Sequence, residues 1–118
     1  MILGIGIDLV DLMRIKELVN DRFINRILSD DELKVYHDLT SEKTKLSYLG
    51  GRFASKEAIF KAIKKGPGKT NYKDFSVLND ENGVPYVKTN FFTHGEIIHI
   101  SITHTDNQAI SYVMIEKV

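Results

Sequence analysis

A chain of 118 residues, 42% of them hydrophobic and 27% charged, has the size and composition of one globular domain, which we assign to residues 1–118. Equal numbers of basic and acidic residues, 16 of each, argue against nucleic acid as a partner, and the absence of cysteine excludes disulfides, thiolate nucleophiles and cysteine-ligated zinc. No apolar run could span a bilayer, and the N-terminus lacks the basic segment of a signal peptide, so we expect a cytoplasmic protein with no membrane partner.

The N-terminal residues predict a buried strand followed by a short helix. From Ile2 to Val10, two glycines and Asp8 alternate with large aliphatic residues. One face of this strand is therefore flat, and a helix could pack closely beside Asp8. Asp11 is a candidate N-cap for a helix that reaches about Val19.

Two more short helices are predicted before the middle of the chain. Apolar residues from Phe23 to Leu28 indicate an amphipathic helical segment. Ser29 followed by Glu32 has the spacing of a capping box, which predicts a helix that extends to about Leu39.

A long central helix is predicted from about Ser41 to Lys65. Gly66-Pro67-Gly68 ends it, because glycine favours the left-handed cap and proline cannot continue a helix. A glycine pair at Gly50-Gly51 lies inside it and costs about 1 kcal/mol of helix propensity per residue, so a close packing contact or a bend is expected there.

Extended segments follow the central helix. Phe75–Leu78 and Val84–Val87 flank a five-residue loop, and Ile97–Thr103 and Ala109–Ile115 flank a second loop, so two hairpins are predicted. The fold class is therefore α+β: an N-terminal strand and helices packed on an antiparallel sheet, with one long central helix.

Asp8 and Glu57 are the residues that could carry chemistry. Two carboxylates that leave coordination positions open suit Mg²⁺, which then takes phosphate oxygens as further ligands. Two simpler interpretations compete with this one. Glu57 and Lys61 have the i, i+4 spacing of a surface salt bridge, and Asp8 could only cap the following helix. Lys56 lies among apolar positions of the same helix and needs an anion, unless it snorkels to water.

The ordered set of motifs resembles the phosphopantetheinyl transferases, specifically the short bacterial holo-acyl-carrier-protein synthase branch. The similarity extends over nearly the whole chain and rests on five segments: Gly4-Ile5-Gly6-Ile7-Asp8, Gly51-Arg52-Phe53, Phe53-Ala54-Ser55-Lys56-Glu57-Ala58-Ile59-Phe60-Lys61, Asn82-Gly83-Val84-Pro85-Tyr86 and Ser101-Ile102-Thr103-His104-Thr105. The resemblance implies transfer of the phosphopantetheine arm of coenzyme A to a serine of apo acyl carrier protein. The other product is adenosine 3′,5′-bisphosphate, and the reaction supports fatty acid biosynthesis.

The resemblance also implies roles for individual residues at the reacting phosphate. Asp8 and Glu57 would hold Mg²⁺, with Mn²⁺ as an alternative, and Lys61 would steady the leaving phosphate. The serine proton would pass either to a water on the metal or to Glu57. Lys56 and Arg52 would contact the remaining phosphates of coenzyme A, although Arg52 could be an ordinary solvated arginine.

Further coenzyme A contacts are implied for Gly66, Pro85 and His104. Each has a purely structural alternative: Gly66 as part of the helix cap, Pro85 as the mark of an edge strand, and His104 as a satisfied core histidine.

An acidic carrier protein needs a basic surface to bind. Arg14, Arg22 and Arg26 are the candidates, with Phe23 as an apolar anchor. Glu17, Asn20 and Asp21 dilute this basic stretch, which could equally be a solvated charged surface. The resemblance further implies a homotrimer whose sites are shared between subunits. The apolar last hairpin would suit such an interface or an ordinary core.

Two rival functions use the same residues. A Mg²⁺-dependent hydrolase would cleave a nucleotide or coenzyme A pyrophosphate with water as nucleophile. A non-catalytic nucleotide-binding module would bind coenzyme A equally well without metal.

Overall fold

A computed structural model describes residues 1–64 and 70–118 of the chain, and its elements confirm the α+β class. In chain order they are β1 (Ile2–Asp11), α1 (Leu12–Leu18), α2 (Asp21–Ile27), α3 (Asp30–Asp38), α4 (Glu42–Ile63), the short 3₁₀ helix η1 (Tyr72–Asp74), β2 (Phe75–Asn79), β3 (Pro85–Thr89), β4 (Glu96–His104) and β5 (Gln108–Lys117).

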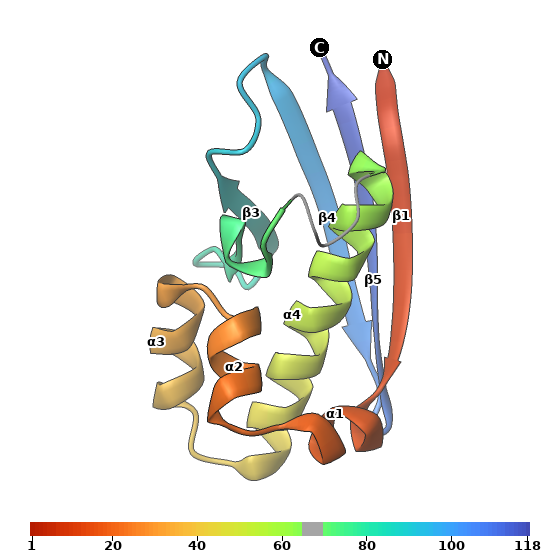
Figure 1. Ribbon diagram of the computed structural model, residues 1–118. Helices are drawn as coiled ribbons and strands as arrows, with labels where there is room; N and C mark the ends of the chain where they lie inside the picture. The colour runs from red at the N-terminus through yellow and green to blue at the C-terminus, as the bar shows by residue number, and fades with distance from the viewer. Residues whose placement is uncertain (65–69) are drawn as a thin grey trace.

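The strands form two separate antiparallel sheets. The larger has the order β1-β5-β4, so the N-terminal strand pairs with the C-terminal one, and the smaller is the β2-β3 hairpin. Figure 1 shows α4 crossing one face of the larger sheet, with α1, α2 and α3 gathered around its first half.

Local sequence explains where the helices begin and end. The predicted capping box is confirmed, because Glu32 N donates to Ser29 Oγ and Ser29 N donates to Glu32 Oε1. The central helix is slightly shorter than predicted: Ser41 is its N-cap and Lys64 is its left-handed C-cap. Asp11 stands at the N-cap of α1, but its side chain accepts from Gln108 Nε2 at 3.1 Å and does not cap the helix.

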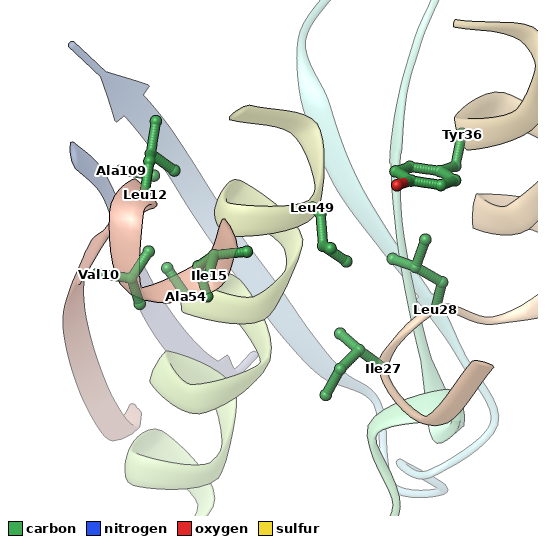
Figure 2. Close-up of a cluster of buried hydrophobic side chains, with 9 residues drawn as sticks. All are labelled: Val10, Leu12, Ile15, Ile27, Leu28, Tyr36, Leu49, Ala54 and Ala109. Carbon is green, nitrogen blue, oxygen red and sulfur yellow. The ribbon is translucent and has the colours of Figure 1, made fainter. Parts of the chain in front are cut away.

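Two hydrophobic clusters lie along α4. The first packs the N-terminal half of α4 against α1, α2 and α3, and against the end of β1 and the start of β5, as Figure 2 shows. It consists of Val10, Leu12, Ile15, Ile27, Leu28, Tyr36, Leu49, Ala54 and Ala109. The second joins its C-terminal half to β2 and β5 and consists of Ala58, Ile59, Phe60, Ala62, Phe75, Val77, Val113 and Ile115.

The sequence predicted a buried strand at β1, and only one of its faces is buried. Ile5, Ile7 and Leu9 are 60%, 58% and 54% exposed on the side away from α4, and Tyr112 lies opposite Ile7 on β5 and is 42% exposed. We call these four residues the outer sheet face. The predicted alternation of the two faces along β1 is confirmed. Alternation alone, however, does not show whether a second layer covers the apolar side.

Candidate active site

β1 and α4 touch through their backbones. A Cβ added to Gly4 or Gly6 would lie 1.9 Å from the carbonyl oxygen of Ala62 or Ala58, respectively, so only glycine fits at these two strand positions. Asp8 is the next residue on the same face of β1. The prediction that a flat strand face lets a helix pack close to Asp8 is therefore confirmed.

Asp8 and Lys61 form an ion pair beside the close contact between β1 and α4. Lys61 Nζ donates to Asp8 Oδ1 at 3.1 Å and to the carbonyl oxygen of Ile7 at 2.9 Å. The salt bridge of Lys61 is therefore with Asp8, and the simpler interpretation of a Glu57–Lys61 pair is wrong. Asp8 also caps no helix, because β1 continues through Asp11 before α1 begins.

Glu57 accepts a hydrogen bond from a residue that the sequence did not single out. The hydroxyl of Tyr72 donates to Glu57 Oε1 at 2.8 Å. Burial, together with the hydrogen bond and charge of Glu57, raises the pKa of Tyr72 to about 12, so the phenol stays protonated at neutral pH. The charge of Asp8 contributes to the same rise in the pKa of Tyr72, as the smallest of its causes.

Lys56 has a different anion from the one expected. Its fully buried ammonium pairs with Glu32, which is also fully buried, and donates to the carbonyl oxygen of Ile27 at 2.6 Å. Burial lowers the pKa of Lys56 and the Glu32 carboxylate opposes this. Glu32 Oε2 also accepts from Val77 N at 2.7 Å. In this structure the Lys56 ammonium does not reach the surface, so a phosphate contact there would need a rearrangement.

Arg52 is buried as well and is no ordinary solvated arginine. Its Nε donates to the carbonyl oxygen of Val77 at 3.0 Å, and one terminal nitrogen donates to Asn79 Oδ1 at 3.3 Å. The guanidinium carbon lies 4.1 Å from the centroid of the Tyr48 ring. Burial lowers the pKa of Arg52 and raises that of Tyr48 to about 12, and the Arg52 charge opposes the shift of Tyr48.

Arg52 and His104 line one cavity of about 290 Å³, and Arg52 also lines a neighbouring cavity of about 470 Å³. His104 is exposed at the last residue of β4, so it is not a core histidine. Pro85 begins β3 and pairs with Asn79, whose side chain borders both cavities. Asp8, Glu57 and Lys61 line neither cavity. The predicted site residues therefore lie in two separate groups on this chain.

The predicted carrier-binding arginines lie on α1 and α2. Arg14, Arg22 and Arg26 are exposed, and we call them the arginine face. The guanidinium of Arg26 lies over the ring of Tyr72, 5.8 Å from its centroid, and Tyr72 is the residue that donates to Glu57. Phe23 is half-buried with its ring centroid 5.8 Å from that of Phe53, so much of it belongs to the core.

Gly66, one of the predicted coenzyme A contacts, lies outside the described residues. Within residues 1–64 and 70–118 no three histidine, aspartate or glutamate side chains gather as a metal-binding group. Over the same residues, no helix has the length and apolar character needed to cross a membrane.

Comparison with known proteins finds one family model and relatives of one kind. Residues 4–113 match the 4′-phosphopantetheinyl transferase superfamily. A holo-[acyl-carrier-protein] synthase of Acholeplasma laidlawii is 50% identical over 116 residues, covering 98% of each chain. The corresponding synthase of Staphylococcus haemolyticus is 47% identical over 121 residues, covering 99% of this chain and 98% of the relative.

Among solved structures, a holo-(acyl-carrier-protein) synthase of Bacillus anthracis, in complex with CoA (3′,5′-ADP), superposes with a TM-score of 0.90. It is 36% identical and the match covers 100% of this chain and 99% of that one. Fold and sequence thus define a transferase of the phosphopantetheinyl class. The chain belongs to the 4′-phosphopantetheinyl transferase superfamily.

Proposed function

We propose that this protein transfers the phosphopantetheine group of coenzyme A to a serine of apo acyl carrier protein, giving holo carrier protein and adenosine 3′,5′-bisphosphate. Full-length similarity to the holo-acyl-carrier-protein synthases supports this reaction. The observation that carries it is the Asp8–Lys61 ion pair where α4 packs on β1, with Glu57 one helical turn before Lys61 on α4. The protein would act in the cytoplasm and support fatty acid biosynthesis.

The two carboxylates fit a magnesium ion, and Mn²⁺ would suit the same oxygens. Asp8 and Glu57 each use one oxygen in the contacts above, and their second oxygens, Asp8 Oδ2 and Glu57 Oε2, accept no hydrogen bond from the described residues. A site with two carboxylates and open positions is the kind that takes substrate phosphates and water as its remaining ligands. A bound ion would neutralise pyrophosphate charge and make the β-phosphorus more electrophilic.

Phosphoryl transfer needs the chain's own residues mainly for positioning and charge. The serine oxygen forms a bond to the β-phosphorus while the bond from that phosphorus to the oxygen of the leaving adenylate part breaks. The serine proton passes to Glu57 or to a water beside it. The Lys61 ammonium, held by Asp8 and Ile7, faces the negative charge that grows on the leaving phosphate.

The other phosphates of coenzyme A would be bound by the second group of residues. Arg52 and His104 share a cavity, and Pro85 lies beside it. Gly66 is still predicted to contact the nucleotide. Lys56 keeps its buried pair with Glu32, and we assign it a structural role beside Glu57.

A homotrimer would join the two groups by placing the cavity of one subunit against the carboxylates of the next. The outer sheet face supports an assembly of this kind, because four large apolar side chains lie together on strands that pair with each other. A contiguous exposed apolar patch marks an interaction site more often than apolar residues that are scattered singly over the surface.

The acidic carrier protein would bind to the arginine face. All three arginines are exposed and come from α1 and α2, and Arg26 lies over the ring of Tyr72, which donates to Glu57. Charges in such a position steer an acidic partner and determine its orientation more than they add affinity.

The test is to mix the protein with coenzyme A, Mg²⁺ and apo acyl carrier protein, and to weigh the carrier by intact-mass spectrometry. We expect the gain of one phosphopantetheine, which EDTA abolishes. Hydrolysis of coenzyme A without modification of the carrier would favour the hydrolase. Coenzyme A binding that is independent of metal, without turnover, would favour the binding module.

A further inference from the structure

Tyr72 contacts the catalytic carboxylate but has no part in the proposed reaction. It lies on η1, 15 residues after Glu57 in the sequence, and its hydroxyl donates to Glu57 Oε1 at 2.8 Å. The phenol oxygen of Tyr72 is attached to a rigid ring, so the ring determines its position, unlike the ammonium at the end of a long flexible lysine. The contact therefore determines which oxygen of Glu57 is engaged and which is available.

The Tyr72 ring is held by three neighbours, so its hydroxyl has a defined position. Its centroid lies 5.0 Å from that of Phe60 and 5.9 Å from that of Phe53, both on α4. Arg26 of α2 places its guanidinium 5.8 Å from the same ring. Ring contacts of this kind stabilise the position of the ring.

The carboxylate of Glu57 needs such a partner. The last torsion of a glutamate side chain is broad, so a carboxylate without a hydrogen bond can rotate freely between orientations. Within the described residues, Tyr72 is the donor to the side chain of Glu57. Partners of this type hold metal-binding carboxylates in place, and their loss typically weakens metal binding about 10- to 100-fold.

We propose that Tyr72 is a positioning residue that fixes Glu57, holding Oε1 through its hydroxyl so that Oε2 is the oxygen offered to a divalent cation. This inference rests on the proposed metal-dependent transfer. It adds a residue that acts through Glu57, and its ring connects the arginine face to the carboxylate through Arg26.

The test compares the wild-type protein with Tyr72→Phe, which removes the hydroxyl and keeps the ring between Phe53 and Phe60. Mn²⁺ binding is measured by the electron paramagnetic resonance signal of the free ion. Saturating coenzyme A is present, carrier protein is absent, and the Mn²⁺ bound by coenzyme A alone is subtracted. We expect the dissociation constant to rise about tenfold in Tyr72→Phe. Tyr36→Phe is the matched control, because the ring of Tyr36 contacts His37, Tyr48 and Lys45 and not the residues at the carboxylates, and its constant stays at the wild-type value.

A double-mutant cycle separates positioning from general damage. Glu57→Ala weakens Mn²⁺ binding by itself, and adding Tyr72→Phe to it has no further effect if the tyrosine acts only through that carboxylate. Thermal melting of each variant shows whether the fold is intact. If Tyr72→Phe changes the Mn²⁺ constant less than twofold while the wild type binds normally, the inference alone is overturned. A wild-type protein that modifies no carrier and binds no Mn²⁺ overturns the proposed function as well.

Discussion

The close packing of α4 on β1 gives a sharp prediction for Gly6→Ala. In a strand, alanine is normally no worse than glycine. Here the new Cβ would lie 1.9 Å from the carbonyl oxygen of Ala58, whereas ordinary contact begins at 3.4 Å. The helix must therefore move by about 1.5 Å, or the strand must bend by as much. Glu57 directly precedes Ala58, so this movement changes its position relative to Asp8.

Both stability and catalysis should respond. Forced overpacking costs about 1–3 kcal/mol, which for a domain of this size lowers the melting temperature by about 5–15 °C. A misplacement of about 1 Å between reacting groups can cost about 100-fold in rate. We therefore expect Gly6→Ala to fold, to melt earlier, and to transfer phosphopantetheine about 100-fold more slowly.

Two other glycine substitutions serve as controls, measured by thermal melting and by carrier mass gain over time. Gly4→Ala makes the same 1.9 Å contact with Ala62, one helical turn farther from Glu57, so it should lose similar stability and less activity. Gly51→Ala meets only Ile102 at 3.6 Å and should gain up to about 1 kcal/mol from helix propensity. Wild-type turnover and melting of Gly6→Ala would refute the reasoning, because the backbone contact would then not determine the site geometry.

Other predictions concern buried pairs, surface charge and pH. Glu32→Ala should lower the free energy of unfolding by about 3–5 kcal/mol in urea titrations, because Lys56 is left buried without its anion; a loss below 1 kcal/mol would contradict this. Arg22→Glu should raise the KM for the carrier and flatten its salt dependence without changing kcat, and an unchanged KM would move the docking surface elsewhere. Tyr48 has a pKa raised to about 12, so folding favours its protonated form. Its contribution is complete below pH 10 and should be lost as the pH rises to about 12. Melting followed across this range should show a smaller decline in Tyr48→Phe, and equal declines would count against the shift.

The sequence predicted most of the fold because its signals are local. Alternation located β1, the spacing of Ser29 and Glu32 located the start of α3, and turn residues located both hairpins. The exposure of the outer sheet face was beyond such reasoning, since the same alternation arises whether or not a second layer covers the apolar side. The side-chain role of Asp11 was also mispredicted, because Gln108 on the last strand competes for it.

The site was predictable where it depends on sequence motifs and obscure where it depends on long-range contacts. The glycines of β1 predicted that a helix packs close to Asp8. The pairing of Asp8 with Lys61 was not predicted, because it joins residues 53 positions apart in the sequence. Glu32 was recognised only as a capping residue, and no local pattern shows that it also neutralises Lys56, 24 residues away. Tyr72 gave no signal of its own, because no motif in the sequence around it marks it as a site residue.

The pairing of β1 with β5 has a consequence for how the chain acquires its site during synthesis. In the described part of the chain the only strand paired with β1 is β5, which runs from Gln108 to Lys117 and is synthesised after the helices and the other strands. The helices can form earlier, but the strand that carries Asp8 stays unpaired until β5 has been made, and such long-range pairing is slow. Asp8 is therefore fixed in its sheet only after the helix that carries Glu57 and Lys61 has been synthesised.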